Sequence, residues 1–165
     1  MVVRRLRRDE WQRLRDIRLR ALADAPGALG EFLEEERGFP AEYWQSIAED
    51  TQQADRRVCV VAEEDGLLVG MVGGDFRPDD RAVHLVALWV EPAVRGRGVG
   101  RALVDALVVW ARERAAGRVE LWVVDDNPAA AAVYESAGFV SSGTRQAVPY
   151  APDAMQTLLV RPLAG

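Results

Sequence analysis

A loop rich in glycine and arginine, residues 91–99, separates a strongly apolar segment from an amphipathic one, and this succession constrains the fold more than any other feature. The apolar segment, residues 82–90, is broken only by His84 and predicts a buried strand. Residues 119–124 predict another strand. Between them, residues 100–116 predict a helix, with apolar residues at helical spacing: Leu103, Ala106, Leu107, Trp110 and Ala111. Strand, helix and strand in this order predict a βαβ unit with parallel strands and a right-handed crossover.

The rest of the chain predicts a mixed α/β (α+β) domain that spans residues 1–165. Asp9 is predicted to cap a helix that ends before Pro26, and a second helix follows Pro40. Residues 31–37 read as a loop or a short helix. A short helix is predicted after Asn127-Pro128, ending near Ser136. Strands are expected at residues 2–6, 57–63, 67–76, 139–144 and 155–161, and those at 57–63, 67–76 and 82–90 form an antiparallel meander.

Composition excludes several classes of function. The chain has 165 residues, 21 basic against 26 acidic, and its net charge of −5 argues against a nucleic-acid partner. Every basic residue is Arg, so chemistry that needs a Schiff-base or P-loop lysine is excluded. The single cysteine, Cys59, excludes a disulfide framework and a multi-cysteine zinc site, and it reads as a core residue. No apolar run suits a signal peptide or a membrane span, so we expect a cytoplasmic protein without a membrane partner.

The glycine-rich loop, Arg95-Gly-Arg-Gly-Val-Gly-Arg101, predicts an anion site suited to a pyrophosphate. Free N–H groups of a first helical turn point out together, and the helix dipole adds partial positive charge. The dinucleotide fingerprint G-x-G-x-x-G fails in both registers, which place Arg101 or Leu103 where glycine is needed. The alternative is a flexible surface loop whose arginines serve solubility.

These residues, together with a second motif, resemble the GNAT superfamily of N-acetyltransferases. The coenzyme A loop of that family, [RQ]-x-x-G-x-[GA], is matched by Arg95, Gly98 and Gly100. Its N-x(6)-Y-x(3)-G-F element is matched in spacing by Asn127, Tyr134 and Gly138-Phe139. The order of the predicted elements also agrees over the whole chain. The resemblance implies a GNAT fold, with a mixed, mostly antiparallel sheet of six to seven strands, about four helices and a βαβ cofactor-binding unit.

The resemblance also implies acetyl transfer from acetyl-coenzyme A to an amine, by direct attack in a ternary complex and without a metal. The pyrophosphate would bind the loop amides of Gly96, Arg97, Gly98, Val99, Gly100 and Arg101. Leu88, Trp89 and Val90 would bind the pantetheine, and a backbone N–H there would face the thioester carbonyl. Asn127 would hold the coenzyme through its side chain. Tyr134 would protonate the leaving thiolate, which suits the ordinary pKa values of a phenol and a thiol.

The general base that takes the amine's proton is left open between His84, Glu120 and water. His84 has an ordinary pKa suited to this role, although it also reads as a rim histidine. Strict alternation would place His84, Val86, Leu88 and Val90 on one face of the sheet. Relatives that acetylate protein N-termini carry a Glu at the position occupied here by Trp122.

Several candidate residues also have plain structural interpretations. Tyr134 could fill space beside the small residues 129–132, and Asn127 is a well-formed N-cap. Asp125 and Asp126 read as turn and cap residues, or as attractors of a cationic amine. The acidic group Glu31, Glu34, Glu35 and Glu36 would favour a cationic acceptor if it lay over the acceptor cleft.

Two other functions compete with acetyl transfer to an unidentified small-molecule or peptide amine. One is a coenzyme A-binding sensor or assembly module without catalysis. The other is an acyltransferase that uses a longer acyl donor. Homodimers are common in the family, so a homodimer is one oligomeric state that the resemblance allows.

Overall fold

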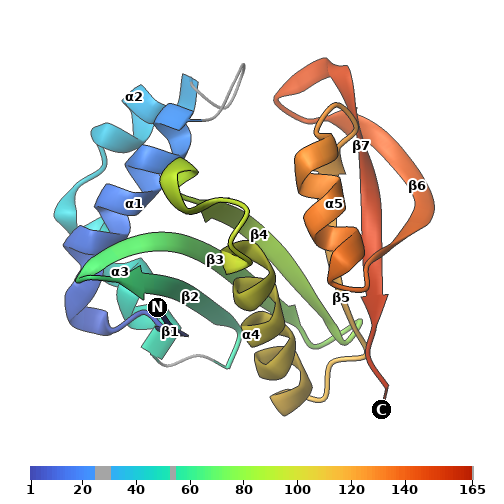
Figure 1. The fold of residues 1–165 in the computed structure, drawn as a ribbon, viewed down its shortest axis with the longest axis horizontal. Helices are drawn as coiled ribbons and strands as arrows, with labels where there is room; N and C mark the ends of the chain where they lie inside the picture. Colours follow the sequence, from blue (N-terminus) through green and yellow to red (C-terminus); the bar gives the residue numbers. More distant parts are fainter. Residues whose placement is uncertain (25–30, 53–54, 165) are drawn as a thin grey trace.

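The computed structural model describes residues 1–24, 31–52 and 55–164, which form a seven-stranded sheet in the order β1-β2-β3-β4-β5-β7-β6 (Figure 1). The strands are β1 (Val2–Arg5), β2 (Arg57–Glu64), β3 (Leu67–Arg77), β4 (Ala82–Val90), β5 (Arg118–Val124), β6 (Val140–Val148) and β7 (Ala151–Pro162). The helices are α1 (Trp11–Asp24), α2 (Glu31–Arg37), α3 (Ala41–Gln52), α4 (Val99–Glu113) and α5 (Pro128–Ser136). Among the described residues, the β4–β5 pair is parallel and the other strand pairs are antiparallel, so the predicted fold class and βαβ unit are confirmed.

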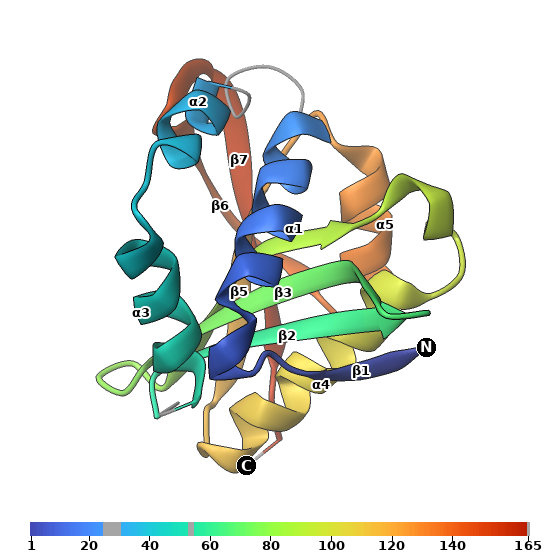
Figure 2. The same ribbon diagram turned by 90° about the vertical axis from the view of Figure 1, so that its left-hand side faces the viewer.

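Helices cover the sheet from two sides (Figure 2). Helices α1 and α3 pack on one face of β2 and β3 around Ile17 and Trp44, both of which are buried. Helix α4 packs on the other face with Leu103, Leu107 and Trp110, and α5 extends that layer over β5 and β7. None of the helices in the described part of the chain is long and apolar enough to cross a membrane.

Two local expectations needed correction. Asp9 does not cap α1: a 3-10 turn at residues 8–10 precedes that helix, and Glu10 accepts the Arg7 backbone N–H at 2.8 Å. Residues 31–37 form the short helix that was one of the two alternatives, and the described chain has five α-helices. Strands β6 and β7 are longer than predicted and meet at a two-residue turn after Val148. Pro152 is the second residue of β7, and a proline is tolerated near the start of a strand.

The two central strands separate soon after they meet. The β4–β5 pairing covers only Ala82–Arg118, Val83–Val119 and His84–Glu120. Strand β5 then stays paired with β7 along its whole length, while β4 stays paired with β3. The sheet is therefore split beyond His84, and the carboxyl ends of β4 and β5 stand on opposite sides of the split (Figure 1).

A β-bulge in β4 reverses its side chains within this split. Val86 pairs with Gly73 and Trp89 with Met71, so two residues of β4 lie opposite one of β3, and Ala87 has a φ of +55°. Leu88 and Val90 consequently pack on the α4 side with Leu85, whereas Trp89 packs on the α1 side. The expectation that His84 and Val86 share a face with Leu88 and Val90 was wrong, because strict alternation ends at the bulge.

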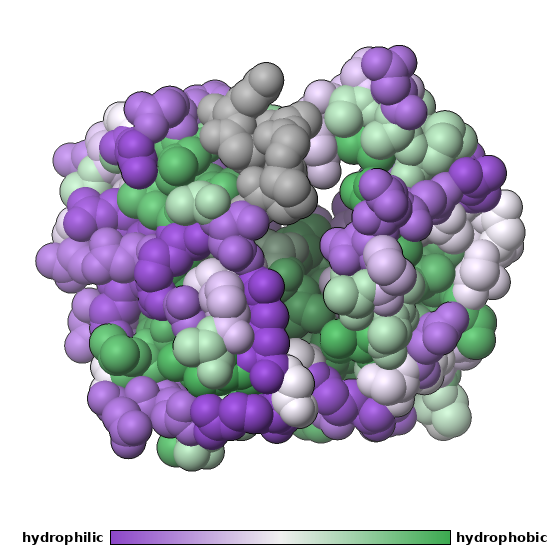
Figure 3. All heavy atoms as spheres, turned by 45° about the horizontal axis from the view of Figure 1, so that its top comes forward, coloured by the Kyte–Doolittle hydropathy of each residue, from purple (hydrophilic) through white to green (hydrophobic). Residues whose placement is uncertain are grey.

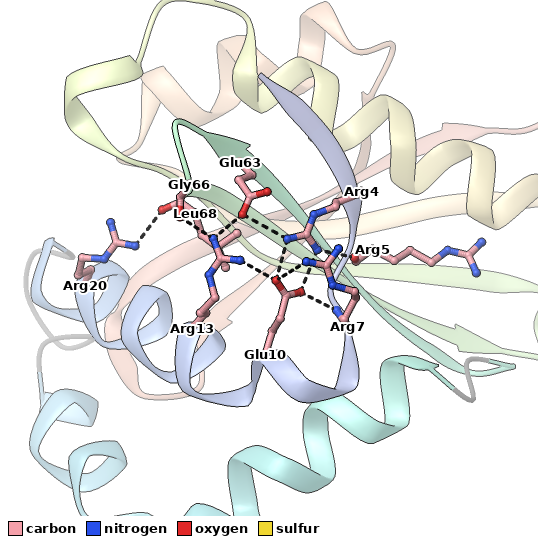
Figure 4. A network of polar contacts seen from close by, with 9 residues as sticks. All are labelled: Arg4, Arg5, Arg7, Glu10, Arg13, Arg20, Glu63, Gly66 and Leu68. Carbon is pink, nitrogen blue, oxygen red and sulfur yellow. Dashed lines mark hydrogen bonds and ion pairs between the residues drawn. The ribbon is translucent and has the colours of Figure 1, made fainter.

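A buried carboxylate fastens the N-terminal strand to the first helix (Figure 4). Glu10 is 5% exposed and accepts hydrogen bonds from both Nη atoms of Arg4, at 2.8 and 2.7 Å, and from Arg13 at 2.6 Å. Arg13 also donates to Glu63 of β2. The Arg4 hydrogen bond, with help from the Arg7 backbone N–H, lowers the pKa of Glu10 to about 2.

We expect Glu10→Gln to lower the free energy of unfolding by about 2 kcal/mol, because Arg4 and Arg13 lose the buried carboxylate between them and keep only Glu63 as a charge partner. The folded pKa lies below the ordinary 4.5, so this stabilisation is present above pH 4.5 and disappears as the pH falls towards 2. Urea unfolding at pH 7 and at pH 3 measures both effects. Glu113→Gln, which breaks the exposed Arg5–Glu113 pair, is the control and should change stability by under about 0.5 kcal/mol. Equal losses for the two variants would contradict a special role for Glu10.

Candidate functional site

A cleft of about 970 Å³ opens where β4 and β5 separate. Its walls are the end of β4, the glycine-rich loop, one side of α5, the β6–β7 tip and the end of α1. Figure 3 shows this hollow between the two halves of the molecule, with apolar residues on its floor and polar residues along its rims. A long, mainly apolar ligand with a charged end would fit such a surface.

The glycine-rich loop presents its backbone to the cleft. Gly96 and Gly98 have φ angles of +78° and +82°, a region that other residues adopt only with strain. A Cβ at either glycine would meet no atom within 4 Å, so the backbone is open to a ligand there. Gly98 is the N-cap of α4, and the N–H groups of residues 99–101 have no acceptor within the helix. The loop therefore offers several amide donors to an anion at the positive end of α4.

The three loop arginines point in different directions. Arg95 donates to the Val90 carbonyl at 2.9 Å and to the Asp24 carboxylate. Arg101 bonds to Asp105 and to the Ser136 carbonyl, and both Arg95 and Arg101 line the cleft. Arg97 instead pairs with Glu64 at the end of β2, at 2.6 Å, and it is not among the lining residues. In this conformation only two of the three predicted cations face the cleft.

The predicted pantetheine and α5 residues do come together. Leu88, Trp89 and Val90 line the cleft opposite Asn127 and Tyr134, which α5 brings across the split. Asn127 is also the predicted N-cap, since its Oδ1 accepts the Ala130 N–H at 3.2 Å. Both interpretations of Asn127 are thus compatible with its position.

Tyr134 combines burial with access to the cleft. It is 8% exposed, and its ring packs edge-on against Phe139 with centroids 5.8 Å apart. Burial raises the pKa of Tyr134 to about 12, so the phenol keeps its proton throughout the usual assay range. A protonated phenol in the cleft wall can donate to an anion that forms there.

His84 lies at the closed end of the split, outside the residues that line the cleft. Its Nδ1 is 3.8 Å from Oε1 of Glu120, the residue with which it is paired on β5. Burial is the main cause that lowers the pKa of His84 below 6.5, so the imidazole is neutral at pH 7. Glu120 is itself buried, and its Oε2 accepts a hydrogen bond from Nε of Arg118 at 3.0 Å. Neither His84 nor Glu120 therefore lines the cleft in this conformation.

The acidic residues proposed to attract an amine are mostly engaged elsewhere. Asp125 accepts from Arg145 and from Thr157, whereas Asp126 lines the cleft. In α2, Glu36 pairs with Arg18 and Glu34 with Arg37. The side chain of Glu31 lies outside the described positions, and Glu35 is exposed. No group of three or more His, Cys, Asp or Glu within the described chain is arranged to hold a metal ion.

Sequence reasoning missed two parts of the cleft. Asp24, at the end of α1, and Tyr150, at the β6–β7 tip, both line it. Tyr150 also packs edge-on against Phe32 of α2, with centroids 5.7 Å apart. These residues belong to no local motif, and only the tertiary fold brings them to the glycine-rich loop.

Comparison with known proteins agrees with this architecture. Residues 11–139 match the sequence model of the acetyltransferase (GNAT) family. A GNAT-family acetyltransferase from Streptococcus pneumoniae superposes with a TM-score of 0.81 at 18% identity, covering 98% of this chain and 99% of that one. The yncA protein of Salmonella typhimurium, solved with acetyl-CoA, has a TM-score of 0.79 at 20% identity, covering 100% and 95%.

Curated relatives are similar over shorter segments. N-alpha-acetyltransferase RimI of Mycobacterium tuberculosis is 42% identical over 91 residues, 53% of this chain and 54% of the relative. A mycothiol acetyltransferase of Thermomonospora curvata is 34% identical over 141 residues, 86% of this chain and 42% of the relative. The chain spans about half of RimI and less than half of that mycothiol acetyltransferase. With the family model covering most of its length and the fold matched along the whole chain, this protein belongs to the acetyltransferase (GNAT) family.

Proposed function

We propose that the protein is an acetyl-coenzyme A-dependent N-acetyltransferase that acts on a primary amine of a small molecule or peptide. The observation that carries this proposal is the split between β4 and β5, which opens beside the amide donors of the loop and the phenol of Tyr134. Membership of the GNAT family supports the same chemistry.

The donor would lie along the cleft with its pyrophosphate on the loop. The amides of residues 96–101 would bind the phosphate oxygens, with Arg95 and Arg101 adding positive charge. The pantetheine would follow Leu88, Trp89 and Val90, and Asn127 would hold it from α5. The bulge interrupts the regular ladder there, so a backbone N–H near Leu88 could donate to the thioester oxygen.

The transfer would proceed by direct attack. The amine nitrogen bonds to the thioester carbon, the C–S bond breaks, and Tyr134 gives its proton to the departing thiolate before regaining one from solvent. The amine must lose a proton, either to His84 or Glu120 through water, or to water itself. Trp89 packs on the α1 side, and alternation with Leu85 places His84 on that side too, so an amine that passes its proton to His84 would approach from the α1 side.

If His84 is the base, we expect an acid limb in the pH profile of kcat/KM. Because the pKa of His84 lies below 6.5, activity should fall as the pH drops through that lowered pKa and the imidazole gains a proton. His84→Gln should remove this limb and lower kcat/KM about tenfold or more. Glu120→Gln serves as the comparison: a limb that persists in the histidine variant and vanishes in the glutamate variant would assign the base to Glu120.

The proposal is tested by thiol release from acetyl-coenzyme A in the presence of polyamines, amino acids and N-terminal peptides. Amine-dependent release, with an acetylated product of the expected mass, supports it. Binding of acetyl-coenzyme A without release for any of these amines would favour the sensor or assembly module. Faster release from a longer acyl-coenzyme A would assign a different donor.

A further inference from the structure

A carboxylate on α1 reaches the glycine-rich loop from the opposite side of the cleft. Asp24 is the last residue of α1. Its Oδ2 accepts the Trp89 indole N–H at 3.0 Å and also accepts from Nη2 of Arg95. Arg95 in turn donates from Nε to the Val90 carbonyl at 2.9 Å. One carboxylate oxygen thus connects the end of α1, the pantetheine strand and the first residue of the loop.

Helix stability does not explain this aspartate. The carboxyl end of a helix carries partial negative charge, so an acidic residue there is unfavourable without a cation nearby. The hydrogen bonds from Trp89 and then from Arg95 lower the pKa of Asp24, which keeps the carboxylate charged. The charge is therefore stabilised by contacts made outside the helix.

One turn earlier, Arg20 strengthens the same junction. Its guanidinium lies 5.6 Å from the centroid of the Trp89 ring, on which it can stack. It also donates to the Leu68 carbonyl at 2.8 Å and pairs with Glu91 (Figure 4 shows the Arg20–Leu68 contact). The last turn of α1 therefore contacts Trp89 of β4 and Glu91, the residue directly after that strand.

The partner of Arg95 differs in position from those of the other loop arginines. Arg97 pairs with Glu64, and Arg101 pairs with Asp105 one turn along its own helix. Neither Glu64 nor Asp105 lines the cleft, whereas Asp24 does. Among these pairs, Asp24–Arg95 is the one that bridges two walls of the coenzyme site.

We propose that Asp24 is a positioning residue for the coenzyme site, and this inference rests on the proposed function. By holding Arg95 against the Val90 carbonyl, it fixes the entry of the loop before Gly96 turns. By holding the Trp89 indole, it fixes the strand that carries the pantetheine. The amide donors are then arranged before the ligand arrives, which lowers the ordering cost of binding.

Asp24→Asn tests this role against simple electrostatics. The amide keeps an oxygen for Trp89 but loses the charge that holds Arg95. We expect the Kd and the KM for acetyl-coenzyme A to rise about five- to tenfold, with kcat and the acceptor KM within twofold of wild type. Removal of a negative charge near the phosphates would by itself tighten binding. Tighter or unchanged binding of acetyl-coenzyme A would therefore overturn the inference.

Two further variants separate positioning from general effects. Glu64→Gln removes the carboxylate paired with Arg97, makes the same change in net charge, and should leave the Kd within twofold. In an Arg95→Gln background, Asp24→Asn should have little additional effect, because the contact it breaks is already lost. Additive losses would overturn the inference and leave the proposed function intact. Failure of the wild-type protein to bind acetyl-coenzyme A would overturn both.

Discussion

Tyr134→Phe is expected to lower kcat about a hundredfold while leaving the Kd for acetyl-coenzyme A within twofold of wild type. The phenol would supply the proton that the departing thiolate takes, and a positioned acid contributes about 10²-fold or more. The phenyl ring keeps the packing against Phe139, so the fold and the coenzyme site stay intact. Steady-state kinetics with a calorimetric Kd measure the two quantities separately.

The pH dependence gives an independent check of this role. Burial raises the pKa of Tyr134 to about 12, so deprotonation of the phenol cannot cause a loss of activity between pH 6 and 10. Any alkaline limb in that range must come from another group and should persist in Tyr134→Phe. A variant that keeps at least half of the wild-type kcat would show that water protonates the thiolate.

Gly98→Asp is expected to raise the Kd for acetyl-coenzyme A about a hundredfold or more. Its carboxylate would lie among the amides that face the pyrophosphate, where like charges a few ångströms apart repel by several kcal/mol. The space is open, since a Cβ added at Gly98 would meet no protein atom within 4 Å. The weaker binding should therefore come from repulsion of the ligand. The positive φ adds a separate backbone strain of about 1–2 kcal/mol, which lowers the stability of the fold.

Gly143→Asp is the matched control for that strain and charge. Gly143 has a φ of +84°, and its added Cβ would also meet no atom within 4 Å, but it lies in β6 and does not line the cleft. Both variants should lose similar stability in thermal unfolding, and only Gly98→Asp should lose binding. Equal Kd values for the two variants would show that the pyrophosphate does not bind at the loop.

Local sequence patterns predicted most of the helices and strands. They could not predict the register between neighbouring strands, on which the position of a bulge depends. The βαβ unit could be predicted because the helical spacing of 100–116 and the flanking strands are readable within one segment. The bulge at Ala87 depends on how β4 is registered against β3, which no pattern within 82–90 encodes. That one feature inverted the expected faces of Leu88 and Val90.

The site divides in the same way. The loop, Asn127 and Tyr134 belong to motifs shared with the GNAT family, so the resemblance implied that they would meet in one site, and they line the same cleft. Asp24 lies 65 residues before Trp89, and its role becomes visible only when α1 packs beside β4. The side chain of Arg97 was predicted to add positive charge to the anion site together with Arg95 and Arg101. It instead pairs with Glu64 at the end of β2.

Hydrogen–deuterium exchange with and without acetyl-coenzyme A tests most directly whether the split between β4 and β5 is the donor site. The predicted result is protection of the amides in residues 96–101, with smaller protection in 88–90 and 127–134. The β6 segment around Gly143 should exchange at an unchanged rate. Protection confined to other segments, or none at saturating ligand, would contradict the proposed site.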